Sequence, residues 1–359
     1  MRRHLRTLLV VLVTVGLLAL FLRQVNLGEV AREIRRASPI DLLLAIVTNL
    51  VVYVFRALRW QAMLEPIGHA RFVPAFRTTV IGFAANTLLP ARAGEFLRPY
   101  LLARQEGLRA TSTFATIVLE RVLDLLTVLF LFALFVFVFD PGMTRVDEGT
   151  YRALKGGGLL AAAGAAALFA AMFLLAGHPE RLGRLVQKAE HVLPLRVAQV
   201  LARLARTFAE GLAVMRRLGP LFRAAALSLP VWLTITASIW LVTRAFHIDM
   251  PFTGSFLIVA LLTVGVTVPT PGAVGGFHYA YRVGATAFFG VPNERAVGAA
   301  IVLHAISFLP AALLGSVFML QDGLSLSKLR SMAASSRDAD TDGGAAAPAP
   351  TASRGGVAT

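Results

Sequence analysis

The chain has 359 residues, of which 57% are hydrophobic and only 15% are charged, and its formal net charge is +15. An ordinary soluble domain carries about 25% charged residues, so this composition excludes one and is typical of an integral membrane protein. The chain has no cysteine, and this excludes disulfides, thiolate metal sites and a cysteine nucleophile.

The predicted elements are nearly all apolar segments. In chain order they cover residues 5–22, 40–55, 72–90, 112–139, 157–177, 221–246, 252–268, 277–291 and 296–320. The first follows a basic head and has no small-residue cleavage site after it, so we interpret it as an uncleaved span and not as a signal peptide. Residues 29–38 predict a short amphipathic helix at the interface, and Ser38 and Pro39 then begin the next helix as N-cap and first residue.

The only sizeable polar region covers residues 178–220 and holds eight Lys and Arg residues. Its apolar residues recur at helical spacing, which indicates either an amphipathic interfacial helix or a solvated connector between two halves. Residues 331–359 have the composition of a disordered tail. We therefore expect a transmembrane domain over 1–330, with halves at about 1–177 and 221–325.

Counting Lys and Arg residues predicts the topology, since cytoplasmic loops of membrane proteins are enriched in both. If 72–90 crossed the membrane fully, the basic connector would lie outside. A re-entrant pair made of 72–90 and the start of 112–139, with a second re-entrant pair in 252–291, instead leaves the connector and both termini in the cytoplasm. The expected fold is an all-α polytopic membrane protein with about six full spans and two re-entrant helical hairpins.

Two stretches rich in Pro and Gly interrupt the apolar segments at corresponding places. They are PARAGEF from Pro90 and PGAVGGF from Pro271, and in both a Gly follows the Pro by four residues and a Phe by six. Interrupted segments at matching positions predict two inverted repeats with a substrate site at the breaks. The freed backbone groups are tolerated at membrane depth only inside protein or against a wet cavity.

Charged residues at the first break suggest a site for an anionic lipid. Arg92 and Arg98 carry guanidinium groups suited to phosphate, and Glu95 either orients these arginines or competes with the phosphate for them. The alternative is that residues 90–98 form a cytoplasmic loop whose charges are solvated.

The next apolar segment begins with Glu120, Arg121 and Asp124. Glu120 and Asp124 are four residues apart and share one helix face. Charges in a span are functional candidates, although acidic capping and snorkelling are the alternative.

Three other polar positions have competing interpretations. Arg56 and Arg59 are either interfacial anchors beside Trp60, which we favour, or a cytoplasmic entrance for a headgroup. His304 is expected to be packed inside the bundle, with a proton relay as the alternative. The seven histidines show no ligand spacing, and we expect no metal and no cofactor.

Four motifs in order are similar to the signature set of the lysylphosphatidylglycerol-synthase transmembrane-region family. They are RALRW (56–60), NTLLPARAGEFLR (86–98), ERVLDLL (120–126) and PTPGAVGGFHYA (269–280). The family consists of flippase-like membrane proteins and includes the N-terminal flippase module of multiple-peptide-resistance-factor proteins. The resemblance covers about residues 5–325 and implies translocation of lipids or polyisoprenyl-linked carriers across the bacterial inner membrane.

The resemblance also implies a set of substrate-binding residues: Arg92, Gly94, Glu95, Arg98, Glu120, Arg121, Asp124, Pro271, Gly272 and Gly275. His278 stands where relatives often have Glu, which is expected to change headgroup preference or proton coupling. The aminoacyl-transferase domain of two-part relatives is not in this sequence, so we expect no enzyme activity. The rival hypotheses are an intramembrane transferase acting on lipid-linked substrates and a non-transporting partner of a lipid synthase.

Overall fold

The computed structural model describes residues 16, 21, 25–89, 92–138, 148–177, 207, 211–267 and 270–323. Most of the predicted first span, most of the 178–220 connector, the whole tail and Pro90 lie outside these residues. Within them, regular secondary structure is entirely helical. The expected all-α class is confirmed.

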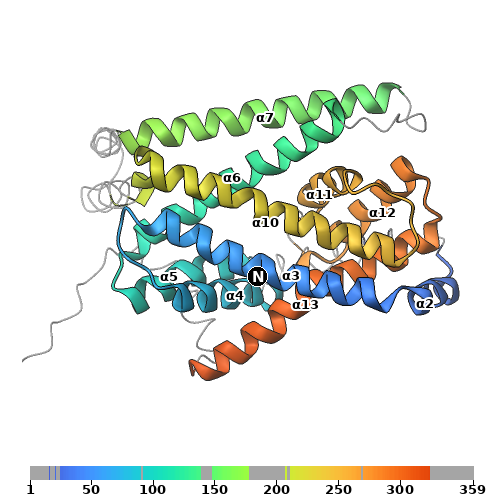
Figure 1. Ribbon diagram of the computed structural model, residues 1–359, viewed down its shortest axis with the longest axis horizontal. Helices are drawn as coiled ribbons and strands as arrows, with labels where there is room; N and C mark the ends of the chain where they lie inside the picture. The colour runs from blue at the N-terminus through green and yellow to red at the C-terminus, as the bar shows by residue number, and fades with distance from the viewer. Residues whose placement is uncertain are drawn as a thin grey trace, which may run out of the picture.

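Long helices run side by side between the two ends of the molecule, with shorter ones packed at each end (Figure 1). In chain order the α-helices are α2 (Leu27–Arg36), α3 (Pro39–Leu64), α4 (Phe72–Leu88), α5 (Gly94–Glu106), α6 (Ala110–Phe137), α7 (Glu148–Gly177), α10 (Leu218–Ala245), α11 (Gly254–Gly265), α12 (Gly276–Phe289) and α13 (Asn293–Gln321).

Four of these helices contain a stretch that is long and apolar enough to cross a membrane: α3, α7, α10 and α13. Helix α6 has 28 residues and is equally long, but it carries Glu120, Arg121 and Asp124 in its middle. The chain is therefore a polytopic membrane protein.

Helix α3 shows how the sequence fits a membrane. The Ser38 hydroxyl accepts a hydrogen bond from the Asp41 amide at 3.4 Å, and Pro39 occupies the first turn, as predicted. On the outer face Ile40 and Leu43 are 71% and 60% exposed. On the inner face Asn49 is buried, together with arginines farther along the helix. The polar face points into the bundle because an unpaired polar group in lipid is costly.

Two helical hairpins enter the bundle from opposite ends (Figure 1). Helices α4 and α5 pack together at one end, and α11 and α12 at the other. The hairpin tips meet, because the 3₁₀ turn Pro271–Ala273 contacts α4.

The return arm of the first hairpin differs from the prediction. Residues 112–117 were expected to form it, but α6 is one continuous helix from Ala110, and the returning arm is α5. The prediction was wrong because the charges in 94–106 resemble those of a cytoplasmic loop. In the folded chain Arg98 is buried against α6, and Gly107, with φ 67°, ends α5 in a left-handed turn.

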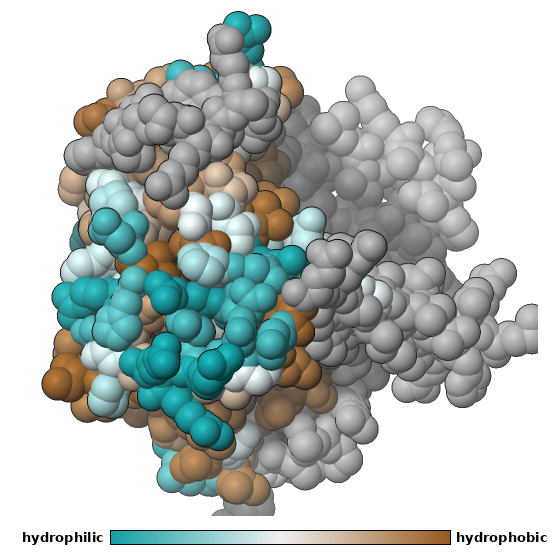
Figure 2. Space-filling view, turned by 90° about the vertical axis from the view of Figure 1, so that its right-hand side faces the viewer, coloured by the Kyte–Doolittle hydropathy of each residue, from teal (hydrophilic) through white to brown (hydrophobic). Residues whose placement is uncertain are grey.

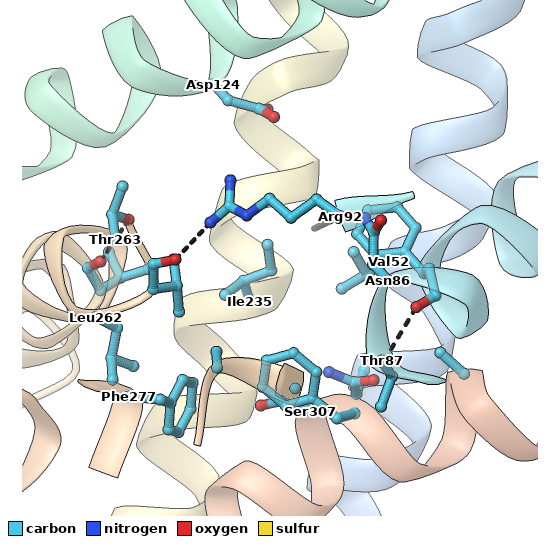
Figure 3. A pocket seen from close by; sticks show the side chains of 18 of the residues that line it. Val52, Asn86, Thr87, Arg92, Asp124, Ile235, Leu262, Thr263, Phe277 and Ser307 are labelled. Carbon is cyan, nitrogen blue, oxygen red and sulfur yellow. Dashed lines mark hydrogen bonds between the residues drawn. The ribbon is translucent and has the colours of Figure 1, made fainter. Parts of the chain in front are cut away.

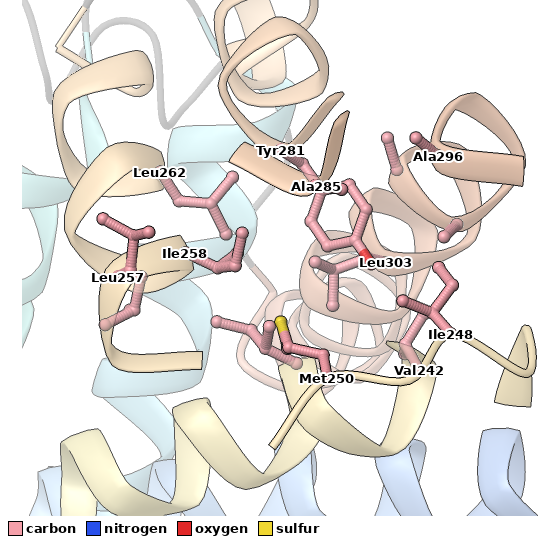
Figure 4. Packing of buried hydrophobic residues seen from close by; sticks show 14 of the residues in the cluster. Val242, Ile248, Met250, Leu257, Ile258, Leu262, Tyr281, Ala285, Ala296 and Leu303 are labelled. Atoms are coloured by element: carbon pink, nitrogen blue, oxygen red, sulfur yellow. The ribbon is translucent and has the colours of Figure 1, made fainter. Parts of the chain in front are cut away.

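Apolar packing fixes the second hairpin against its neighbours. Figure 4 shows Ile258 and Leu262 of α11 pointing towards Tyr281 of α12 and Leu303 of α13, with Met250 in the same cluster. The Thr243 and Tyr281 hydroxyls, 3.0 Å apart, satisfy each other inside this core.

The end of the molecule that carries α2 is hydrophilic (Figure 2). Here α2 lies against α13 through the buried Val30, as expected for an interfacial amphipathic helix. Arg295 pairs with Glu33 at 2.9 Å, and Arg244 pairs with Asp41. The first ion pair joins α2 to α13, and the second joins α3 to α10.

Gly94 allows the first hairpin to close, and we expect Gly94→Ala to open it. A Cβ at this position would lie 1.8 Å from the carbonyl oxygen of Gly82 on α4. Overpacking of this kind costs about 1–3 kcal/mol, so thermal unfolding of the detergent-solubilised protein should begin several degrees lower. Gly156→Ala is the matched control, because Gly156 lies in α7 with open space around its Cα. Equal melting temperatures for both variants would contradict the close approach.

Candidate functional site

A cavity of about 390 Å³ lies where the two breaks meet. Its walls come from α3, α4, α5, α6, α10, α11, α12 and α13 and from both breaks. The volume is at the lower end of the range for ligand pockets, roughly 300–1,000 Å³. It is therefore large enough for a headgroup and the first part of a chain.

The cavity is lined by both polar and apolar side chains. The charged and amide side chains are those of Asn49, Asn86, Arg56, Arg92, Glu95, Arg121 and Asp124, and the apolar ones include Val259, Leu262, Phe277, Leu303, Phe308 and Ala311. A ligand that fills the cavity must itself have a polar part and an apolar part.

Beside the cavity, Glu120 and Asp124 are the centre of a buried ion cluster, and of the two only Asp124 also lines the cavity. Glu120 accepts hydrogen bonds from Arg98 at 3.0 and 3.1 Å, and its Oε1 atom lies 3.2 Å from Nη2 of Arg59. Asp124 pairs with Arg59 at 2.6 Å. Arg121 lies 2.5 Å from Glu120 and 3.1 Å from Asp124. Arg56 is farther away, at 3.6 and 3.8 Å from the two carboxylates.

Aromatic and hydroxyl groups hold the cluster in place. The Arg98 guanidinium stacks 3.9 Å from the centre of the Trp60 ring. The Trp232 indole donates to Asp124 at 2.9 Å, and Arg59 donates to the Ser228 hydroxyl at 3.1 Å. A single charge at the centre of a membrane helix costs roughly 2.5–3.5 kcal/mol. The charges persist here because they are paired with one another inside the protein.

Arg92 crosses the cavity from the first break to the second. In Figure 3 its side chain extends towards α11, with Asp124 on one side of it and Phe277 and Ser307 on the other. The guanidinium donates to the backbone carbonyl of Val266, the C-cap residue of α11, and lies 3.7 Å from Glu95. The carbonyl is one of those that an α-helix leaves unpaired at its end. Arg92 has φ 50°, a left-handed conformation that is uncommon outside glycine.

The second break places a pair of histidines beside the cavity. The rings of His278 and His304 lie 4.4 Å apart, and His304 Nε2 is 2.7 Å from the carbonyl oxygen of Gly272. Gly275, with φ 91°, donates its amide to Nδ1 of His278 at 3.4 Å. His304 is packed inside the bundle, as predicted.

The structure brings together residues that are far apart in the sequence. Of the predicted site residues, Arg92, Glu95, Arg121, Asp124 and Gly272 line the cavity. Gly94 packs against Gly82 in the hairpin instead, and Arg98 and Glu120 lie in the buried cluster behind the wall. Pro271 begins the 3₁₀ turn of the second break, and Gly275 and His278 follow it at the start of α12.

Our preferred interpretation of Arg56 and Arg59 as interfacial anchors is wrong. Arg59 and the neighbouring Trp60 are 0% exposed, and Arg56 is 7% exposed and lines the cavity. Both arginines face inwards because the carboxylates that neutralise them are on α6. Sequence spacing places them at the end of a span but does not show which partner they meet.

Several site residues were missed in the sequence. Asn49, Asn86 and Trp232 line the cavity, and the Val266 carbonyl receives Arg92. A polar side chain in the middle of the apolar segment 40–55 was a signal that could have identified Asn49. The Val266 carbonyl gave no signal in the sequence, because every residue has a backbone carbonyl. Only its position in the fold distinguishes it.

The fold and the cavity define a polytopic helical membrane protein with a charged site inside the bundle. Residues 7–315 match the family model described as the lysylphosphatidylglycerol synthase TM region, so the chain belongs to this family. The family predicted from the four motifs is confirmed.

Curated relatives match shorter parts of the chain. A UPF0104 membrane protein of Methanothermobacter thermautotrophicus is 30% identical over 36% of this chain and 39% of its own length. A second UPF0104 membrane protein, from Methanocaldococcus jannaschii, is 29% identical over 35% of this chain and 38% of its own length. The glycosyltransferase AglD of Haloferax volcanii is 33% identical over 33% of this chain and 19% of its own length. The matched segments thus span less than half of each relative.

We expect Glu120→Gln to destabilise the protein strongly, because it removes a carboxylate that contacts four arginines while keeping the side-chain shape. Breaking a buried ion pair costs about 3–5 kcal/mol. Unfolding in detergent micelles, followed by circular dichroism, measures the loss.

Glu65→Gln is the control for the same chemical change. Glu65 pairs with Arg223 at a site where both side chains are about half exposed, 47% and 55%. Such a surface pair contributes about 0–1 kcal/mol. Comparable losses in the two variants would contradict a neutralising role for Glu120.

Proposed function

We propose that this protein is a lipid flippase that moves an anionic lipid between the leaflets of the membrane by alternating access. The observation that carries the proposal is a cavity inside the bundle whose lining combines three arginines with many apolar side chains. A lipid has a polar headgroup and apolar chains, so it can contact both kinds of side chain. The family supports a role in lipid handling, since it is named for the membrane region of lysylphosphatidylglycerol synthase.

Two inverted repeats are part of the proposal. Helices α3–α6 of the first half would correspond to α10–α13 of the second. In support, α4 packs on α13 while α11 packs on α6, and α3 packs on α10, so exchanging the halves keeps each pair. Each hairpin also closes on a pair of glycines: a Cβ at Gly265 would lie 2.5 Å from the carbonyl oxygen of Gly276, as Gly94 approaches Gly82. The sequence match between the two breaks pairs Gly94, the first residue of α5, with Gly275. Helix α12 begins one residue later, at Gly276.

Both hairpins are proposed to be re-entrant. At 1.5 Å per residue, α4 spans about 26 Å and α11 about 18 Å, whereas the hydrocarbon core is about 30 Å thick. Arms of this length reach the middle of the membrane and return. Residues 5–22 are predicted to span the membrane in addition to α3, α6, α7, α10 and α13, which gives six spans. With the basic connector 178–220 in the cytoplasm, both termini would then lie on the cytoplasmic side of the cell inner membrane.

The proposed roles of the charged residues follow their positions. Arg56 and Arg121 reach the cavity wall and would contact the phosphate of the lipid. Glu95 and Asp124 lie on the same wall and would compete with that phosphate. Arg59, Arg98 and Glu120 stand behind the wall and would hold the others in position.

Arg92 is proposed to be a latch between the two halves, because it joins the first break to the C-terminal end of α11. Locking the breaks together should therefore stop transport. In an Arg92→Cys, Thr267→Cys double variant, a short bifunctional thiol reagent should reduce lipid transfer at least ten-fold. The natural chain has no cysteine, so only these two positions react. Each single-cysteine variant treated with the same reagent is the control, and unchanged transfer in the cross-linked protein would contradict alternating access.

An intramembrane transferase is the rival function, and the match to a protein named glycosyltransferase AglD favours considering it. Asp124 on the cavity wall would be the candidate base, but it is already paired with Arg59 and Trp232. Product formation from a radiolabelled lipid would favour the transferase. A non-transporting partner of a lipid synthase would instead tolerate neutral substitutions around the cavity.

Transfer of fluorescent lipids in reconstituted liposomes tests the flippase. We expect Arg56→Gln and Arg121→Gln to slow the transfer of labelled phosphatidylglycerol or phosphatidic acid at least ten-fold, because each removes a charge-assisted contact of about 1.5–3 kcal/mol. Arg223→Gln is the matched control, since its guanidinium pairs with Glu65 away from the cavity. Equal rates for all four proteins would refute the site assignment, and no transfer by the wild type would refute the flippase.

A further inference from the structure

The charges around the cavity do not cancel. Among the described residues, the wall and the cluster behind it contain five guanidinium groups, of Arg56, Arg59, Arg92, Arg98 and Arg121. They contain three carboxylates, of Glu95, Glu120 and Asp124. Two positive charges therefore remain in excess, and the neighbouring His278 and His304 can only add to them.

Part of this excess is directed at the cavity. The Arg56 side chain is only 8% exposed, and its Nη1 atom lies 3.6 and 3.8 Å from the carboxylates of Glu120 and Asp124 without a hydrogen bond to either. The Nε atom of Arg121 also has no hydrogen-bond partner among the described residues. Both arginines line the cavity. Guanidinium donors without hydrogen-bond acceptors are costly, and an incoming anion would supply oxygens for them. It would compete with Asp124, whose Oδ2 atom also has no hydrogen bond among the described residues.

The size of the excess specifies the anion. In a site of low polarity, a ligand with one negative charge leaves one positive charge uncompensated, whereas a ligand with two cancels the excess. A phosphodiester headgroup carries a single negative charge. A phosphate monoester carries about 1.5–2 negative charges near pH 7, and a diphosphate carries at least two.

We propose that the ligand of this cavity is a doubly charged phosphate group, a monoester or a diphosphate, on an apolar chain. The inference rests on the proposed lipid-binding function and narrows it. The apolar side chains of Val259, Leu262, Leu303 and Phe308 receive the chain. Arg56 and Arg121 receive the phosphate, and Arg92 leaves the Val266 carbonyl to join them or to admit the ligand.

Binding to the purified full-length protein in detergent tests this proposal. Dioctanoyl phosphatidic acid and dioctanoyl phosphatidylglycerol share their chains and differ in phosphate charge, and isothermal titration calorimetry at pH 7.5 measures both. We expect phosphatidic acid and farnesyl diphosphate to bind at least ten-fold more tightly than phosphatidylglycerol. Inorganic phosphate should bind at least ten-fold more weakly than phosphatidic acid. If inorganic phosphate bound as tightly as phosphatidic acid, the ligand would not need an apolar chain, and that part of the proposal would be overturned. If phosphatidic acid and phosphatidylglycerol bound within three-fold of each other, the preference for a doubly charged phosphate would be overturned.

A charge-shift variant separates the charge rule from general damage to the site. Arg121→Gln reduces the excess to one positive charge, and we expect the preference for phosphatidic acid over phosphatidylglycerol to fall to about three-fold or less. Because the comparison is made between two ligands on one variant, a loss of active protein does not change the ratio. Arg223→Gln should keep the wild-type ratio. An unchanged ratio in Arg121→Gln would overturn the proposal.

The failure of this proposal is distinguishable from the failure of the flippase. If the protein transferred lipids in liposomes but bound phosphatidic acid and phosphatidylglycerol equally, the flippase proposal would stand and the proposal of a doubly charged ligand would be contradicted. Tight, selective binding of phosphatidic acid with no transfer of any lipid would keep the ligand class and remove the transport.

Discussion

Neutralising charge inside a membrane is the constraint on which the rest of this structure depends. Glu120 and Asp124 lie in the middle of α6, where neither could face lipid. Arginines from α3 and α5 turn inwards to meet them, and Trp232 and Ser228 of α10 complete the hydrogen bonds. Four helices are thereby fixed to one another by a cluster whose members would each be unfavourable alone.

The breaks lie beside the cluster, at the same cavity, for a related reason. Each hairpin ends in a turn that leaves backbone groups without helical partners, and such groups are tolerated only against protein or a wet cavity. Arg92 and His304 satisfy two of them, the carbonyls of Val266 and Gly272. One polar cavity therefore serves both the buried charges and the interrupted backbone.

The two proposed halves are interlocked, and this bears on the proposed mechanism. Helix α4 of the first half packs on α13 of the second, and α11 of the second packs on α6 of the first. A movement of either hairpin would therefore be felt by a long helix of the other half. One direct contact between the hairpin tips is the Arg92 hydrogen bond, which is the kind of interaction that a ligand phosphate could replace.

The sequence by itself determined the class of protein, its family and the features that depend on neighbouring residues. Composition required a membrane, Ser38 and Pro39 marked a helix start, and the spacing of Glu120 and Asp124 put both on one face. Only the tertiary structure decided that residues 94–106 form a helix, that Arg56 and Arg59 point inwards and that Arg92 spans the cavity. Arg59 meets Asp124 across 65 residues and Arg92 meets Val266 across 174. A charge shows no local sign of such a partner, so the sequence could not distinguish a buried ion pair from a solvated loop.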